Sequence, residues 1–307
     1  MTFRDFCLAV FTIFLWSTSL IVQKIGVNYI SIYALNVIRL TAAIPLLLFF
    51  YRGLPKSFLR YAMCAFFWNT IGPICIGFAL KLGAGAGMTS FLTQLNVFFA
   101  IFFCFLLLGE RPRWVEMAGM GVAFCGVYLI TKAGLEAPGH TSFIGVFLIL
   151  CYAAAWGFAF TLLKKFKIGA HFEDNLWLSV FAIPQLFGVQ LFMEGPHQAL
   201  VEAQHLSLIG ITCSLYVGAI STLLGSYFWF NLAQRSSAAA QAPFMLLLPL
   251  FTCLLSVVFL GEQLTGFQIG AGALIVLGVC LAHSLNLFKG AKMKTLFNVL
   301  KQRMSHG

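Results

Sequence analysis

Long apolar runs separated by short polar connectors constrain this chain more than any other feature. A helix that crosses the hydrocarbon core of a bilayer needs about 20 residues, and ten runs of about that length can be placed in the sequence. They lie at 6–25, 32–51, 58–80, 88–108, 114–131, 142–163, 175–193, 206–232, 237–260 and 265–287. The number and length of the runs predict a protein that crosses a membrane many times.

The composition leads to the same fold class. Hydrophobic residues make up 61% of the chain and charged residues 9%, whereas a soluble domain carries about 25% charged residues. Backbone polar groups in lipid must be bonded within the protein, and helices of this length achieve that. We therefore predict an all-α integral membrane protein with ten transmembrane helices. The first run, 6–25, is interpreted as an uncleaved span, because no small-residue cleavage site follows it.

The basic residues predict the orientation. Most of the 19 Lys and Arg residues lie in the N-terminal segment, the even-numbered connectors and the C-terminal tail. Cytoplasmic segments carry such an excess, so both termini are predicted to be cytoplasmic. Topology also explains the net charge of +10, and no nucleic-acid partner is expected. The basic tail 289–307 is interpreted as a cytoplasmic helix at the lipid headgroups, with a regulatory or partner-binding tail as the alternative.

The second half of the sequence repeats the first. Residues 86–131 form a predicted helical hairpin around Gly109-Glu110, and a similar hairpin around Gly261-Glu262 follows 152 residues later. Each repeat contains five spans, and an odd number of spans places the second repeat upside down relative to the first. We expect a first repeat at 1–135, a second, inverted repeat at 136–288 and the tail beyond it. Inverted repeats are typical of secondary transporters, whose site lies between the halves near the bilayer midplane.

Several motifs together resemble a known family. They are the pair Trp16 and Lys24, the intramembrane Arg39, the hairpin AGMTSFLTQLNVFFAIFFCFLLLGER and the later stretch SYFWFNLAQRSSAAAQAPFMLLLPLFTCLLSVVFLGEQ. Over nearly the whole chain the sequence resembles the EamA-type family of the drug/metabolite transporter superfamily, and within it the exporters of amino-acid metabolites of the serine and cysteine type. The resemblance implies a ten-span, inverted-repeat transporter of the bacterial inner membrane. The second connector departs from the usual Gly-Glu-Arg, because Gln263 follows Glu262.

Polar and aromatic residues gather near the middle of several predicted spans. Amides at that depth either bond between helices or face an aqueous cavity, and both readings stay open for each residue. Candidate substrate-binding residues are Trp16, Ser19, Gln23, Lys24, Arg39, Asn69, Thr93, Gln94, Asn96, Tyr152, Trp156 and Tyr227. Together they predict a central cavity between the halves.

For each of four charged residues, a functional and a structural role are both considered. Arg39 lies inside a predicted span, where it either meets a substrate carboxylate or extends toward the interface. Lys24 has the same ambiguity, and the family pattern favours a role in gating or cargo attraction. Glu110 and Glu262 end apolar runs. They are read as anchors at the start of the next helix in preference to proton-linked gates.

Missing motifs narrow the function. The sequence contains neither a G-x-x-x-x-G-K-[ST] loop nor an H-E-x-x-H motif, and it has no acidic residue in the middle of a predicted span. We predict no enzyme activity, no cofactor and no metal. The favoured function is export of small polar metabolites by alternating access, with lipid and a small-molecule substrate as partners. The alternatives are another cargo in the same fold, such as a nucleotide-related, purine or drug-like compound, or a membrane sensor or assembly protein.

Overall fold

The computed structural model describes residues 3–50, 53–55, 57–112, 114–136, 143–169, 171–235, 244–245 and 247–281, and these residues form helices and turns without a strand. Seven helical segments are long and apolar enough to cross a membrane, and three shorter apolar helices accompany them. Each of the ten overlaps one predicted span, which supports the all-α membrane class. The ten-span topology and the inversion of the second half stay predictions. The tail 289–307 and parts of the last two spans lie outside the described residues.

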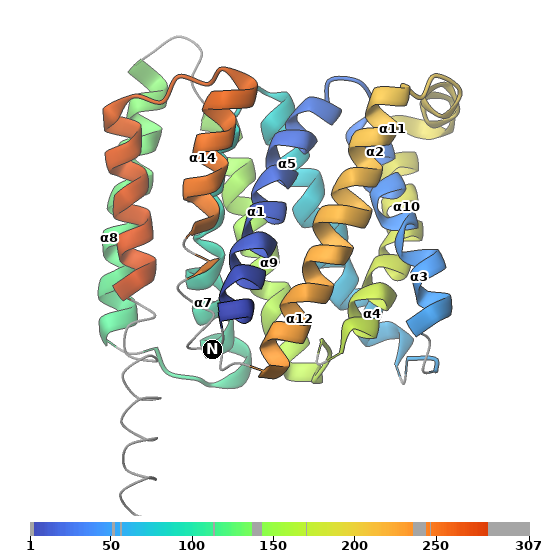
Figure 1. The fold of residues 1–307 in the computed structure, drawn as a ribbon, viewed down its shortest axis with the longest axis horizontal. Coiled ribbons are helices and arrows are strands. Elements are labelled where there is room, and N and C mark those ends of the chain that lie inside the picture. The colour runs from blue at the N-terminus through green and yellow to red at the C-terminus, as the bar shows by residue number, and fades with distance from the viewer. Residues whose placement is uncertain are drawn as a thin grey trace, which may run out of the picture.

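The helices lie side by side in one bundle (Figure 1). Those of the first half are α1 (Phe3–Gly26), α2 (Ile32–Thr41), α3 (Ala43–Phe50), α4 (Phe58–Ala65), η1 (Phe66–Ile71), α5 (Gly72–Lys81), α6 (Ala86–Thr93), α7 (Asn96–Leu108) and α8 (Trp114–Glu136). Those of the second half are α9 (Phe143–Phe166), α10 (Phe172–Gln204), α11 (Leu208–Leu215), η2 (Tyr216–Leu224), α12 (Gly225–Arg235) and α14 (Leu247–Leu260). A further apolar helix covers Gly266–Leu281.

Four spans that we expected to be continuous are interrupted. The span at 32–51 divides into α2 and α3 at Ala42, and the span at 88–108 divides into α6 and α7 at Gln94 and Leu95. The spans at 58–80 and 206–232 contain the π-helices η1 and η2. A shift of η1 by the 152-residue repeat places it within η2. Because π-helices are frequently found at functional sites, both regions are candidates for one.

Helix α10 is longer than its predicted span at 175–193. The segment 194–205, which lies between two predicted spans, is helical as far as Gln204. Gly195 has a φ of 78° and interrupts the helix, and Pro196 begins the next turn. Glycine is common at a helix end and proline at a helix start. Gly195 and Pro196 therefore mark a kink in the helix, and this polar segment is not a loop.

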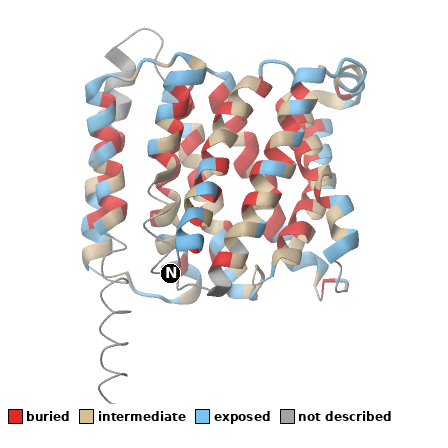
Figure 2. Ribbon diagram, viewed as in Figure 1, coloured by how far each residue is buried: buried red, intermediate tan, exposed pale blue. Residues whose placement is uncertain are grey.

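Each half of the chain packs against elements of the other half. Helix α1 contacts α11, η2, α12 and α14, all from the second half, whereas α9 contacts η1, α5, α6 and α7 from the first. The largest buried cluster joins α6, α7 and α9 around Phe91, Leu95, Phe98 and Ile149. Buried residues line the faces where helices meet (Figure 2). The contacts of α1 and of α9 therefore connect spans that are far apart in the sequence.

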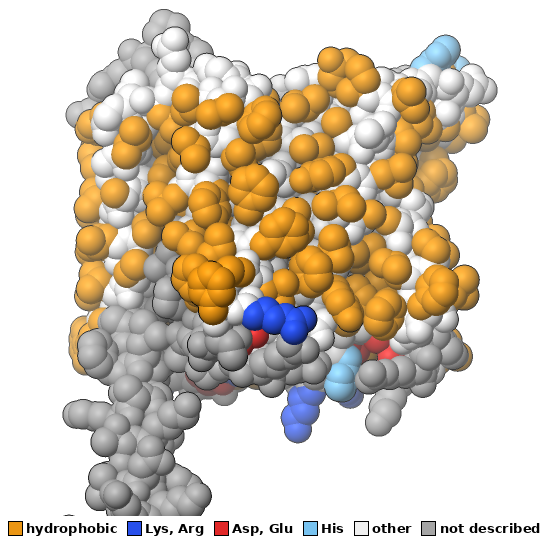
Figure 3. Space-filling model, viewed as in Figure 1, with side chains coloured by type: hydrophobic (Ala, Val, Ile, Leu, Met, Phe, Trp, Pro, Cys, Tyr) orange, Lys and Arg blue, Asp and Glu red, His pale blue; other side chains and the backbone are white. Residues whose placement is uncertain are grey.

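The outer surface suits a lipid environment. Hydrophobic side chains cover most of the face shown in Figure 3, and the visible Lys and Arg side chains lie along its lower edge. Large exposed residues such as Phe49, Phe192 and Trp114 are each more than 80% exposed. An apolar surface of this extent matches the hydrocarbon of a bilayer.

Candidate functional site

An aromatic stack marks the contact between α9 and η1. Trp156 of α9 stacks on Trp68 of η1 with ring centroids 4.0 Å apart and an interplanar angle of 17°. Tyr152, one turn earlier on α9, lies 6.0 Å from Trp156. A Cβ on Gly72, the residue that follows η1, would lie 3.4 Å from both side chains. The structure thus brings the predicted residues Tyr152 and Trp156 together, with Trp68, which the sequence analysis did not select, as their partner.

A similar arrangement is found at η2. Trp16 of α1 lies 5.3 Å from Trp229, and a Cβ on Gly225 would lie 2.6 Å from the Trp16 indole nitrogen. Gly225 follows η2 as Gly72 follows η1. Each π-helix therefore ends at a glycine against which a tryptophan from the other half packs. Trp16 and Trp156 belong to two separate aromatic groups.

Arg39 and Asn69 are buried polar residues close to these π-helices. Arg39 lies in the last turn of α2, and its carbonyl oxygen would be 2.0 Å from a Cβ on Gly218 of η2. Asn69 lies within η1. The Nε atom of Arg39 and the Nδ2 atom of Asn69 have no hydrogen-bond partner among the described residues. Tyr152 is within electrostatic range of Arg39, which connects α2 with the aromatic stack.

The predicted residues of the fourth span lie at the break between α6 and α7. Gln94 donates from Nε2 to the carbonyl oxygen of Met245 over 3.1 Å, so its amide connects the two halves. Thr93 donates to the carbonyl oxygen of Ser90, and the half-buried Asn96 begins α7. Of the two interpretations given for amides at this depth, the structure favours a hydrogen bond between helices for Gln94.

The remaining candidates are dispersed. Gln23 is buried and Ser19 half-buried on α1. Tyr227 is 37% exposed, and its ring contacts Phe50 and Phe172, which form a different aromatic cluster.

Hydrogen bonds that the sequence analysis did not anticipate tie α1 to the second half. Ser221 donates to the carbonyl oxygen of Leu15 over 2.9 Å, and the hydroxyls of Thr18 and Tyr216 are 2.8 Å apart. Hydroxyl side chains are small and common in membrane helices, so no sequence signal distinguished these residues.

Lys24 pairs with Glu262. Lys24 Nζ lies 2.6 Å from Glu262 Oε1, and the two side chains are 21% and 12% exposed. Glu262 also accepts hydrogen bonds from the backbone nitrogens of Ala86 and Gly87, the first residues of α6. The expectation that Glu262 anchors the helix following it is wrong, because its carboxylate caps α6 instead.

Burial raises the pKa of the Glu262 carboxyl, but the bonds from Lys24 and from the two backbone nitrogens outweigh it. The pKa of Glu262 consequently lies below its ordinary value. Glu262 is therefore an ionised partner of Lys24 at neutral pH and is not suited to exchange a proton there.

Lys164 pairs with Glu110. Lys164 Nζ lies 2.6 Å and 2.7 Å from the two carboxylate oxygens of Glu110, and the side chains are 48% and 50% exposed. We expected Glu110 to be anchored at the start of α8 with its neighbouring arginines, and the structure pairs it with α9 instead. In the repeat, Lys24 corresponds to Lys164 and Glu110 to Glu262. Each lysine therefore binds the acid of the other half.

The two ion pairs occupy opposite ends of the bundle. The N-terminus of α1 and the turn between α7 and α8 both lie at the lower end in Figure 1. Glu110 belongs to that turn, whereas Lys24 belongs to the last turn of α1 at the upper end. The more buried pair thus lies at the upper end.

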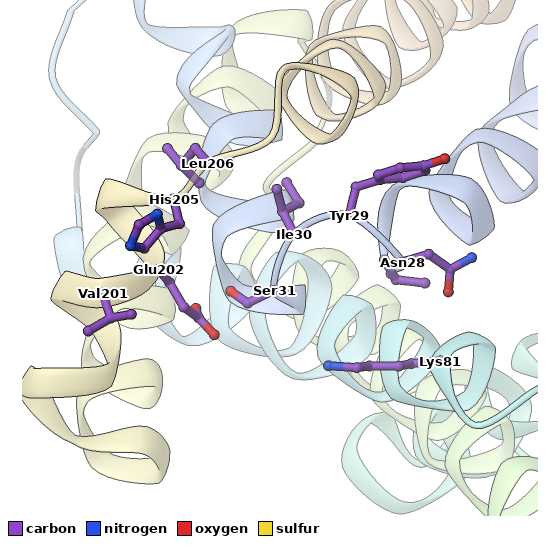
Figure 4. Close-up of a pocket in the computed structure, with 10 residues that line it drawn as sticks. Asn28, Tyr29, Ile30, Ser31, Lys81, Val201, Glu202, His205 and Leu206 are labelled. Carbon is purple, nitrogen blue, oxygen red and sulfur yellow. The ribbon is translucent and has the colours of Figure 1, made fainter.

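A cavity of about 540 Å³ lies at one end of the bundle, away from the aromatic stack. Its lining comes from the connector after α1, the end of α5 and the end of α10, and Tyr29, Lys81, Glu202 and His205 are its ionisable residues. Lys81 points toward the side of the cavity where Glu202 and Ser31 lie (Figure 4). The expected central cavity thus remains a prediction, and this terminal one was not anticipated.

Comparisons with known proteins agree with the membrane fold. A sequence model of the EamA-like transporter family matches residues 5–132 and again 143–283. A protein of Salmonella typhimurium named "Probable amino-acid metabolite efflux pump" is 27% identical, over 91% of this chain and 94% of its own length. The Escherichia coli protein of the same name is 25% identical over the same shares.

Two further comparisons extend this result. A Streptantibioticus cattleyicolor protein named "Probable terminal-alkyne amino-acid exporter" is 24% identical over 93% of this chain and 95% of its own length. A crystal structure with 18% sequence identity superposes with a TM-score of 0.62 and covers 92% of this chain and 96% of that one. At that identity the superposition shows a shared fold alone.

Proposed function

The chain belongs to the EamA-like transporter family, and on this premise we propose that it is a secondary transporter exporting small polar metabolites, namely amino acids of the serine and cysteine type. It is a multi-pass membrane transporter and not an enzyme. The observation that carries the cargo proposal is the pair of full-length relatives named as amino-acid metabolite efflux pumps. No contact among the described residues favours a purine, nucleotide-related or drug-like cargo over an amino acid.

We further propose that 1–135 and 136–288 are inverted repeats. The support is that equivalent residues make equivalent contacts across the halves. Trp16 packs on the glycine after η2 and Trp156 on the glycine after η1. Lys24 binds Glu262 and Lys164 binds Glu110. Reciprocal contacts of this kind follow if a two-fold axis in the membrane plane relates the halves.

The ion pairs provide a physical basis for alternating access. Rocking of α1 away from α14 separates Lys24 from Glu262, and rocking of α9 away from α7 separates Lys164 from Glu110. In the arrangement described here, the Lys24–Glu262 pair is the more buried one. With cytoplasmic termini, this end faces away from the cytoplasm. The protein is then closed on the outer side and ready to accept cargo from the cytoplasm of a bacterial cell.

Transport by purified protein in liposomes tests the proposal. Vesicles loaded with radiolabelled L-serine, L-cysteine or O-acetylserine should release label faster than protein-free vesicles, with and without an imposed proton gradient. Failure to move any compound of a broad amino-acid and metabolite panel would overturn the function. The two gradient conditions separate a proton-coupled exporter from a uniporter.

The aromatic stack provides a matched pair of variants. Trp156→Ala removes the ring stacked on Trp68, whereas Trp114→Ala removes a ring that is 83% exposed. We expect the first change to lower the transport rate about two- to tenfold, because an aromatic pair contributes about 0.5–1.5 kcal/mol beyond its buried area. The second change should leave the rate unchanged. Equal transport rates in both variants would contradict a role of the stack in transport.

A further inference from the structure

Two buried nitrogen donors lack acceptors in the interior of the protein. Arg39 is 9% exposed and Asn69 is 4% exposed. Arg39 Nε and Asn69 Nδ2 have no hydrogen-bond partner among the described residues. Unpaired buried donors are costly and uncommon in folded proteins, so each requires an explanation. Both groups carry N–H bonds, and the ligand that completes them must supply acceptors.

Among the described residues, no acid forms an ion pair with Arg39. Glu110 and Glu262 are engaged by Lys164 and Lys24 at the ends of the bundle. The electrostatic neighbour of Arg39 is Tyr152. An arginine in the interior of a membrane protein normally meets an anion or a water-filled path. A bound anion would therefore compensate the charge of Arg39 where the described residues do not.

Helix α2 ends at Thr41, two residues after Arg39, and α3 begins at Ala43. Ala42 keeps helical φ and ψ angles, and Pro45 lacks the N–H that would bond to the Thr41 carbonyl. The end of α2 therefore follows from Pro45. Asn36 lies three residues before Arg39, on the same face of α2. Its Oδ1 atom has no hydrogen-bond partner among the described residues, although its Nδ2 donates to Ile32.

From these observations we propose that Arg39 binds the carboxylate of the cargo, and that Asn36 Oδ1, on the same face of α2, accepts a hydrogen bond from its ammonium group. The proposal rests on the transport function above and defines its cargo as zwitterionic compounds with a free carboxylate. The aromatic stack of Tyr152, Trp156 and Trp68 borders this site through Tyr152. Amides and amines that lack the carboxylate are poor cargo.

Competition against labelled L-serine tests the proposal on the wild-type protein. L-serinamide replaces the carboxylate with a neutral amide and keeps the rest of the molecule. Unlabelled L-serine should inhibit transport at a concentration at least about tenfold lower than L-serinamide does. Equal inhibition by the two compounds would overturn the inference, and this comparison does not depend on any variant folding.

Variants then identify the residue. Arg39→Gln should weaken inhibition by L-serine about tenfold or more and abolish the preference over L-serinamide. Arg39→Lys keeps the charge but loses the planar fork, so it should retain part of the preference. Arg60→Gln is the matched control, because Arg60 is exposed and packs over the Phe166 ring. A full preference in folded Arg39→Gln protein would overturn the assignment.

A binding measurement separates failure of this site from failure of the transport function. If the wild type moves no amino acid, the transport proposal fails. The site is then tested by thermal unfolding of the purified protein with L-serine, lactate or acetate, each paired with its amide. Stabilisation by the carboxylates alone, lost in Arg39→Gln, supports the site. No difference between acids and amides contradicts it.

Discussion

At the scale of single residues, Glu262 shows how one carboxylate can organise two distant segments. It accepts hydrogen bonds from the Lys24 side chain and from the first two backbone nitrogens of α6. Gly85 is suited to this contact, because a Cβ there would lie 3.2 Å from Glu262 Oε2. Glu262 therefore has a structural function at the upper end of the bundle, whichever cargo is transported.

The lowered pKa of Glu262 predicts a pH dependence of stability. A depressed carboxyl pKa contributes stability above the ordinary Glu value of about 4.3, and the contribution is lost as the pH falls through the lowered value. Glu262→Gln should cost about 1–2 kcal/mol at pH 7. When the pH is lowered from neutral to acidic, the Glu262→Gln protein should lose less stability than the wild type. Thermal unfolding in detergent measures both.

Glu110→Gln is the control for this measurement, because the Lys164–Glu110 pair is about half exposed and should contribute less than about 1 kcal/mol. A Glu262→Gln protein as stable as Glu110→Gln, or one with the same acid profile as the wild type, would contradict the assignment of Glu262 as a cap.

At the scale of elements, the π-helices bring backbone unusually close to backbone. Gly218 lies in η2, and a Cβ there would be 2.0 Å from the carbonyl oxygen of Arg39. A side chain at this position must push α2 away from η2, since a backbone oxygen cannot move alone. Gly218 is thus required for the position of Arg39 as well as for helix packing.

Gly218→Ala should destabilise the protein by about 3 kcal/mol, at the upper end of the range for overpacking. Gly270→Ala is its control, because nothing lies within 4 Å of a Cβ at Gly270. Thermal unfolding should separate the two, and L-serine transport should fall in the first variant alone. Equal stability of both variants would show that α2 and η2 tolerate a wider spacing.

The sequence predicted the positions of the helices well and their interruptions poorly. Apolar runs indicate where a chain crosses lipid, because hydrophobic length is a local property. A π-turn adds a single residue to a helix, and in stretches as short as 66–71 and 216–224 no change of period reveals it. The end of α2 at Thr41 does have a sequence signal, because Pro45 lacks the N–H that would bond to the Thr41 carbonyl.

Side-chain partners were harder to predict than elements. Tyr152 and Trp156 were correctly placed together by helical spacing, since they are one turn apart on α9. Gln94 has a partner, Met245, that is 151 residues away in the sequence. Glu262 was assigned to its neighbouring helix because local capping is the usual arrangement, whereas its carboxylate accepts hydrogen bonds from the first nitrogens of α6. In the sequence, only the repeat indicated that a lysine of one half could form an ion pair with an acid of the other.

At the scale of the whole molecule, the charge distribution predicts which ends face the same compartment. Arg111 follows α7 at the lower end, and Lys81 ends α5 at the upper end beside the terminal cavity. Cytoplasmic termini place the lower end in the cytoplasm. Single cysteines at these two exposed positions, in a protein otherwise free of cysteine, report the orientation.

We expect a membrane-impermeant thiol reagent to label Lys81→Cys in intact cells or right-side-out vesicles and Arg111→Cys only in inverted vesicles. The two variants act as controls for each other, and detergent should make both reactive. Labelling of both positions from one side would contradict the topology, and the reverse pattern would place the termini outside.

The pairing of Lys24 with Glu262 has a consequence for biosynthesis. The two residues are 238 positions apart, so α1 enters the membrane long before the ribosome has made its partner. Until the last hairpin arrives, the lysine is unpaired and the first turn of α6 lacks its cap. Formation of these contacts therefore waits until residue 262 has been made, and nascent proteins that stop short of it would present an unpaired lysine and an uncapped helix to quality-control proteases.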